Sequence, residues 1–116
     1  MPQHIPFGRT GEDLAARWLS EKGFSVLQRN WRHGRNEVDI IAGRQGVLHF
    51  IEVKSRRSTR YGNPEQSVSQ KKLGNVMRGA SGWLHRWPAF HRVQYDVLAI
   101  TLDKDALPEY VLFEDV

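Results

Sequence analysis

Two apolar stretches of this chain carry ionisable residues where a simple core strand would carry none. Asp39 lies within residues 37–42, and Glu52 and Lys54 lie within residues 48–54. Both stretches are rich in the β-branched residues that favour strands. Side chains alternate between the two faces of a strand, so Glu52 and Lys54 share one face. Two carboxylates and a lysine beside an apolar core suit metal-dependent cleavage of a phosphodiester.

The connection between the two expected strands decides whether Asp39 meets Glu52. A four-residue turn at residues 43–46 places Asp39 opposite Phe50 and therefore diagonal to Glu52, within reach of a shared ion. Glu37 then lies opposite Glu52, and we interpret it as a supporting residue at the edge of the sheet. A slip of one residue would turn one carboxylate to the other face, so the prediction depends on the turn length.

The chemistry of the pair favours a divalent cation. Two carboxylates held together repel each other, and one becomes protonated unless a cation joins them. An oxygen-only donor set suits Mg²⁺ or Mn²⁺. Lys54 would offset part of the negative charge, orient or deprotonate the attacking water, or stabilise charge on the phosphorus. The alternative is structural: Glu52 and Lys54 form an ordinary surface ion pair at a sheet edge.

The remaining pattern predicts an α/β domain with the element order αβββαββ and one mixed sheet flanked by helices. The spacing of Thr10-Gly11-Glu12-Asp13 is that of a capping box, and Gly23 is a typical helix stop. Residues 1–7, with two prolines, resemble a tail. The other expected elements are strands at residues 24–31, 37–42, 47–54, 92–102 and 110–113, and a second helix around residues 73–84.

Composition limits the class of protein. The chain has 116 residues, 40% of them hydrophobic, which fits one domain over residues 1–116. Its net charge of +4 favours polyanionic partners, nucleic acid first. The absence of cysteine excludes disulfides and thiolate sites. No apolar run approaches the roughly 20 residues of a membrane span, and no secretory signal is present, so we expect a cytoplasmic protein without a membrane partner.

Several short motifs carry a family resemblance. Residues 37–41, Glu-Val-Asp-Ile-Ile, and residues 50–56, Phe-Ile-Glu-Val-Lys-Ser-Arg, resemble the PD-(D/E)xK nuclease core of restriction enzymes and Holliday-junction resolvases. Residues 8–16, 30–32 and 61–64 narrow the resemblance to the small bacterial YraN-type proteins, which are nuclease-like. Asn36 departs from the pattern, because the family commonly has glycine there. The resemblance implies a restriction-endonuclease-like fold and, as in resolvases, a homodimer, although no heptad or apolar edge identifies an interface.

The resemblance also implies residue roles. Asp39 and Glu52 would be the metal carboxylates, with the backbone carbonyl of Val53 as a further ligand. Lys54 would be the catalytic lysine. Glu12 would be the accessory acid on the first helix, although it also fits a first-turn acid favoured by the helix dipole.

Basic residues cluster in sequence around these positions and would bind nucleic acid. The resemblance adds Gln70 and Lys71 near the scissile phosphate. Trp31 could stack on a base or pack in the core, and Asp96 is interpreted as a structural hydrogen-bond acceptor. The residues expected to bind DNA are Arg32, Arg35, Arg56, Arg57, Arg60, Gln70, Lys71 and Lys72.

Two functions remain open from the sequence. The first is a Mg²⁺- or Mn²⁺-dependent DNA endonuclease that recognises branched or otherwise unusual DNA, because no base-reading motif is present. The second is a catalytically silent nucleic-acid-binding module that keeps the nuclease fold and acts through a partner protein.

Overall fold

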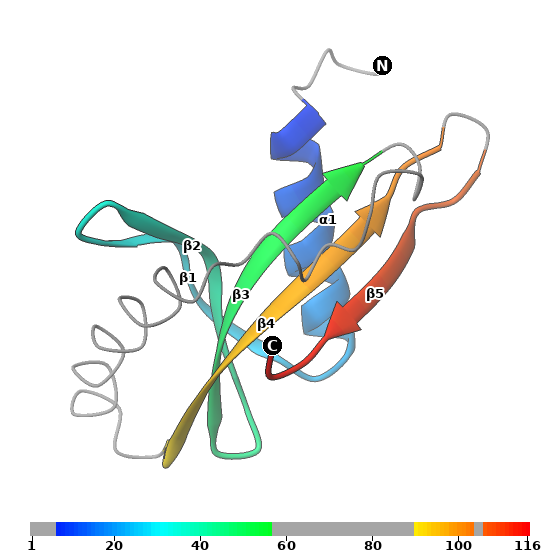
Figure 1. Ribbon diagram of the computed structural model, residues 1–116. Coiled ribbons are helices and arrows are strands. Elements are labelled where there is room, and N and C mark those ends of the chain that lie inside the picture. The colour runs from blue at the N-terminus through cyan, green and yellow to red at the C-terminus, as the bar shows by residue number, and fades with distance from the viewer. Residues whose placement is uncertain (1–6, 57–89, 104–105) are drawn as a thin grey trace.

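The computed structural model describes residues 7–56, 90–103 and 106–116. Within these residues one helix and five strands form an α/β unit with a mixed sheet, as expected (Figure 1). The expected second helix, around residues 73–84, lies outside the described residues, so the described order has one helix where the sequence predicts two. The elements are α1 (Phe7–Glu21), β1 (Ser25–His33), β2 (Asn36–Arg44), β3 (Val47–Arg56), β4 (Arg92–Thr101) and β5 (Glu109–Phe113).

The strands follow one another across the sheet in the order β1-β2-β3-β4-β5. β3 and β4 are parallel over their whole length, whereas the other neighbouring pairs are antiparallel. α1 packs on one face of this sheet, where it contacts β1, β3 and β4 (Figure 1). We call this the helix face and the other the open face. The parallel β3–β4 pair occupies the centre, where both faces are buried.

α1 begins at Phe7, which corrects two expectations. Thr10 lies inside the helix and is therefore not its N-cap, because a Thr-x-x-Asp spacing also occurs by chance within a helix. Phe7 belongs to the helix and not to a tail. The predicted stop is confirmed: Gly23 has a φ of 93°, the left-handed conformation in which glycine commonly ends a helix. In the described part of the chain, no helix has the length and apolar character that crossing a membrane requires.

The sheet separates two apolar clusters. On the helix face, Ala15 and Leu19 of α1 pack against side chains that include Ile40, Ile51 and Leu98. The open-face cluster consists of Val38, Ile41, Leu48, Phe50, Tyr95 and Val97. Burial on both faces explains why β3 and β4 read as nearly continuous apolar runs in the sequence.

The β2–β3 connection is shorter than expected. Arg44 pairs with Val47, so the loop consists of Gln45 and Gly46 alone, with φ values of 52° and 79°. Two positive φ values in a two-residue loop define a type I′ turn, whose twist matches that of the flanking strands. The predicted register was therefore wrong by two residues. Because side chains alternate with a period of two, this even shift kept the paired residues 40–44 on their expected faces.

The β1–β2 ribbon bends sharply before it reaches its tip. Asn30 has a φ of 56° and lies between the Arg29–Ile40 and Trp31–Val38 pairs, across from Asp39. Regular alternation would put Val38 and Ile40 on one face, yet Val38 belongs to the open-face cluster and Ile40 to the helix-face cluster. The left-handed residue in β1 thus coincides with a reversal of the faces of both strands.

Candidate functional site

A cleft of about 460 Å³ opens where β2 leaves β3. The β2–β3 ladder ends at the Ile40–Ile51 pair, and the two strands separate beyond it. The separation leaves Asp39 and Glu52 on the wall of a space instead of in a closed sheet. The lining residues are Arg35, Asn36, Glu37, Asp39, Glu52, Val53 and Lys54.

Asp39 is held in place by the backbone of β3. The amide of Val53 donates a hydrogen bond of 2.7 Å to Oδ2 of Asp39. Burial is the main cause that raises the pKa of Asp39 above its ordinary value, and the nearby Glu12, Glu52 and Glu37 carboxylates raise the pKa further, against the lowering effect of the Val53 amide. Asp39 therefore lies in a negative, partly desolvated environment that a cation would relieve.

Each carboxylate oxygen of Glu52 has a neighbouring polar group, a hydroxyl at Oε1 and an ammonium at Oε2. Its side chain is only 6% exposed, and Oε1 accepts a 3.1 Å hydrogen bond from the hydroxyl of Tyr95. Oε2 lies 3.2 Å from Nζ of Lys54. Burial first, and then Glu52, raise the pKa of Tyr95, so this hydroxyl stays a proton donor at neutral pH. Tyr95 was missed from the sequence, although a buried tyrosine in an aliphatic strand generally needs a partner for its hydroxyl.

Glu12 approaches the same region from α1. Its carboxylate lies 3.5 Å from the guanidinium of Arg29, which forms a shorter ion pair of 2.8 Å with Asp13. The Glu12 charge raises the pKa of Asp39, but Glu12 is not among the residues that line the cleft. A Cβ at Gly11 would overlap Oγ of Ser55, so glycine permits the close approach of α1 to the end of β3 that brings Glu12 near.

The family of this chain follows from comparison with known proteins. A family model described as "Uncharacterised protein family UPF0102" matches residues 11–100. The chain belongs to the UPF0102 family. The YraN-type membership expected from the motifs is thereby confirmed.

Its similarity to individual UPF0102 proteins extends over most of each chain. It is 38% identical to one from Phocaeicola vulgatus over 104 residues, which cover 90% of this chain and 86% of that protein. It is 42% identical to one from Chlorobaculum parvum over 113 residues, covering 92% and 88% of the two chains. The identity to one from Rhodococcus opacus is 39% over 110 residues, covering 94% and 93%.

The residues of this UPF0102 chain that are expected to bind DNA do not all lie at the cleft. Arg35 lines the cleft, whereas Arg32 lies 3.4 Å from Glu37 with 76% of its side chain exposed. Arg56 ends β3, and its carbonyl accepts a 2.7 Å hydrogen bond from the amide of Leu102. The other residues expected to bind DNA lie outside the described residues, namely Arg57, Arg60, Gln70, Lys71 and Lys72.

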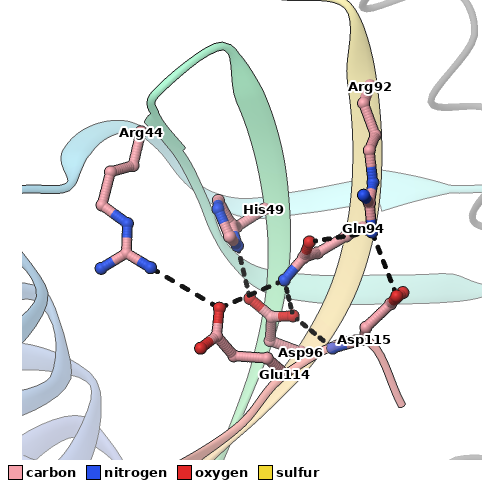
Figure 2. Close-up of polar contacts among 7 residues, drawn as sticks. All are labelled: Arg44, His49, Arg92, Gln94, Asp96, Glu114 and Asp115. Atoms are coloured by element: carbon pink, nitrogen blue, oxygen red, sulfur yellow. Dashed lines mark hydrogen bonds and ion pairs between the residues drawn. The ribbon is translucent and has the colours of Figure 1, made fainter.

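A second polar cluster (Figure 2) shares no residue with the lining of the cleft, and its His49 packs against Phe24 on the helix face of the UPF0102 chain. His49, Asp96 and Glu114 offer ligand atoms within 4.8 Å of one another, a spacing compatible with a metal ion. Their atoms, however, already engage neighbouring groups. Nδ1 of His49 lies 2.6 Å from Oδ2 of Asp96, and Arg44 lies 3.5 Å from Glu114.

Asp96 is the centre of this cluster and acts as the structural acceptor that the sequence predicts. Its Oδ1 accepts hydrogen bonds from the Gln94 amide at 3.0 Å and from the backbone amide of Asp115 at 2.9 Å (Figure 2). Arg92 adds an ion pair of 3.1 Å to Asp115. We interpret the cluster as structural, because its hydrogen bonds and ion pair hold the segment after β5 against β4. The participation of His49 and Gln94 depends on the β3–β4 register, which the sequence does not specify.

Proposed function

We propose that this UPF0102 protein is a Mg²⁺- or Mn²⁺-dependent DNA endonuclease with a restriction-endonuclease-like fold. The observation that carries the proposal is the convergence of Asp39, Glu52 and Lys54 on one cleft. These residues come from two strands that separate at this point, so each side chain borders the same space.

The charge of the cleft supports a cation requirement. Its lining contains three carboxylates, Asp39, Glu52 and Glu37, and two cations, Lys54 and Arg35, so the ionised lining carries a net charge of −1. A cleft of charge −1 repels a phosphodiester, whereas one divalent cation would bring the sum to +1. The donors are carboxylate oxygens, which suit Mg²⁺ or Mn²⁺. The raised pKa of Asp39 also supports a cation requirement, because a bound cation would stabilise the ionised carboxylate.

Each side chain then has a role. Asp39, oriented by the Val53 amide, and Glu52, oriented by Tyr95, would hold the cation, with Val53 contributing its carbonyl. The bound cation supplies Lewis-acid chemistry, lowering the pKa of water and withdrawing charge from the phosphate. Lys54 would place its ammonium beside the charge that develops on the phosphorus oxygens. Glu12 would act indirectly, through its field at Asp39.

The competing proposal is a nucleic-acid-binding module without catalysis. The 3.2 Å contact between Lys54 and Glu52 is compatible with it, because a structural ion pair would have the same geometry. The two proposals differ in what Lys54→Ala does. Loss of Lys54 abolishes metal-dependent cleavage by an enzyme and only alters the affinity of a binding module.

The test is cleavage of labelled single-stranded, duplex, flap and four-way DNA with Mn²⁺. Wild type, Asp39→Asn and Lys54→Ala are purified identically, with Lys22→Ala as a charge-matched control. Lys22 lies at the end of α1, where it contacts the Trp18 ring and not the cleft. We expect cleavage by the wild type and the control alone. Equal cleavage by all four proteins would identify a contaminant, and no cleavage by any would favour the binding module.

A further inference from the structure

The tip of the β1–β2 ribbon projects beyond the rest of the sheet (Figure 1). We call residues 30–39 the arm. In the arm β2 pairs with β1 alone, because its ladder with β3 ends at Ile40. The arm closes in a turn at Gly34 and Arg35, and Gly34 has a φ of 63°. Val38 and Trp31 pack in the open-face cluster, whereas residues 32–35 at the tip are exposed, so the side chains of the tip are available for another purpose.

One side of the arm carries two parallel aromatic rings. The rings of Trp31 and His33 have an interplanar angle of 3° and centroids 5.8 Å apart. Trp31 also packs edge-on against Phe50 with centroids 5.2 Å apart, which anchors it to the open-face cluster. His33 is exposed. Phe50 shares its face of β3 with Glu52, so the aromatic pair lies on the face that carries the cleft carboxylate.

The arm also carries a cation that the described residues do not neutralise. Arg35 lines the cleft and is exposed, and it forms no ion pair with any residue in the described ranges. By contrast, Arg32 is paired with Glu37, and Arg29 with Asp13. One positive charge and one exposed ring thus lie on the segment that leads away from the cleft.

We propose that the arm binds an unpaired stretch of DNA that continues from the phosphate in the cleft. His33, supported by Trp31, stacks on a base, and Arg35 pairs with a backbone phosphate. A base offers its face to a side chain only when it is not stacked within a duplex, so a ring platform selects unpaired nucleotides. This inference rests on the proposed function for the nature of the polymer, and it specifies that the substrate has single-stranded character next to the scissile phosphate.

The test is fluorescence anisotropy with a labelled single strand and with its duplex, in EDTA so that no cleavage occurs. His33→Ala removes the ring and should weaken binding of the single strand by about tenfold while leaving duplex binding within twofold. His33→Phe keeps a ring and should restore the affinity. Arg35→Gln should weaken binding and make the slope of log affinity against log salt shallower by about 0.7.

Arg17→Gln is the control for the loss of one positive charge. Arg17 is exposed on α1 and close to Tyr110 of β5, at the opposite edge of the sheet from β1. Its variant should bind the single strand within twofold of wild type. Melting temperatures are measured for every variant, and because His33 is exposed, its substitution should leave the fold intact.

Two outcomes overturn the inference. Single-strand binding unchanged by both His33→Ala and Arg35→Gln would exclude the arm as a contact surface. Equal losses on single strand and duplex would show contact with the duplex and not with unpaired bases. Because binding is measured without metal, a protein that binds through the arm but never cleaves contradicts the proposed endonuclease and leaves the arm's role intact.

Discussion

Tyr95 donates its hydroxyl to Oε1 of Glu52 over 3.1 Å, joining the centre of β4 to the candidate metal carboxylate on β3. The parallel register aligns Tyr95 with Phe50, so the ring lies two residues from Glu52 on the same face. Lys54 approaches the other oxygen. The orientation of Glu52 therefore depends on a residue that does not line the cleft.

Tyr95→Phe should weaken metal binding without disrupting the sheet. The substitution keeps the ring in the open-face cluster and removes one hydrogen bond to a buried carboxylate, at a cost of about 1–2 kcal/mol in unfolding free energy. Loss of a group that orients a metal ligand typically reduces metal affinity by about 10–100-fold. Calorimetric titration with Mn²⁺ measures the change.

The control for this substitution is Tyr110→Phe. Tyr110 stacks on Trp18 with ring centroids 5.2 Å apart, on the helix face of the sheet. The Tyr110→Phe protein should bind Mn²⁺ with the same affinity as the wild type. If Tyr95→Phe also bound Mn²⁺ with wild-type affinity, the hydroxyl would have no part in positioning Glu52.

Asp39→Asn should stabilise the protein in EDTA and remove its response to metal. Asn can still accept the Val53 amide through its carbonyl oxygen, while the repulsion from Glu12, Glu52 and Glu37 disappears. Since the cleft is open to solvent, the expected gain is about 1 kcal/mol or less, or a few degrees in melting temperature.

Mn²⁺ should raise the melting temperature of the wild type, and it should leave that of Asp39→Asn unchanged. Asp103→Asn, at an exposed position, is the isosteric control and should respond to Mn²⁺ as the wild type does. A metal response that survives Asp39→Asn would place the cation elsewhere.

The raised pKa of Asp39 sets the direction of the pH dependence. Between its ordinary value of 3.8 and the raised value, folded Asp39 holds a proton that the unfolded chain has lost. The contribution of Asp39 to unfolding free energy therefore falls as the pH rises through this window. A cation requires the carboxylate, so Mn²⁺ affinity should rise with pH over the same range and binding should release protons.

Calorimetric titration of the wild type with Mn²⁺ at about pH 5 and about pH 7 measures the affinity. Repeating it in buffers of different ionisation enthalpy measures the number of protons released. The affinity should be higher at the higher pH. A pH-independent affinity without proton release would mean that Asp39 does not hold the metal.

The meeting of Asp39 and Glu52 at one cleft was expected, but parity accounts for it only as far as Ile40, where the β2–β3 ladder ends. A turn of four residues and one of two give registers that differ by two, so both put residues 40–44 on the same faces. Asp39 lies beyond this ladder, where the faces of β2 reverse, and its position also depends on the left-handed conformation of Asn30. The length of the turn could not be predicted, because it depends on left-handed conformations at Gln45 and Gly46, and glutamine rarely adopts one.

Two other features depend on tertiary context and could not be predicted. Asparagine tolerates a positive φ better than the other residues of β1, but its presence does not specify that the strand adopts one at Asn30. The polar cluster around Asp96 requires the parallel β3–β4 register, which pairs His49 with Gln94. Parallel strands are joined by long connections, so no local pattern fixes their alignment.

Gln45→Asn should stabilise the β2–β3 turn. Both turn residues have positive φ, which asparagine tolerates better than glutamine, and Asn-Gly is the preferred pair for a type I′ turn. The expected gain is about 0.5–1 kcal/mol, or several degrees in thermal unfolding followed by circular dichroism. Gln28→Asn in β1 is the control and should give no gain. A destabilised Gln45→Asn protein would argue against the I′ geometry.

Asn30→Val should disturb the metal site from a distance. Valine adopts a positive φ at a cost of about 1–2 kcal/mol, which lowers the melting temperature and favours a straighter ribbon. A straighter ribbon would carry Asp39 away from the Val53 amide, so Mn²⁺ affinity should fall by about tenfold. Asn30→Gly tolerates the left-handed conformation and should keep wild-type metal affinity. The measurements are thermal unfolding and Mn²⁺ calorimetry on both variants.

Gln28→Val separates the effect of the bend from that of a β-branched residue in β1. Gln28 is not among the positive-φ residues of the described chain, so valine there should leave Mn²⁺ affinity unchanged. If Asn30→Val lowered the melting temperature but bound Mn²⁺ like the wild type, the bend would serve the fold alone. If Asn30→Val changed neither the melting temperature nor the Mn²⁺ affinity, Asn30 would not hold a strained conformation. The reversal of faces that brings Asp39 to Val53 would then have another cause.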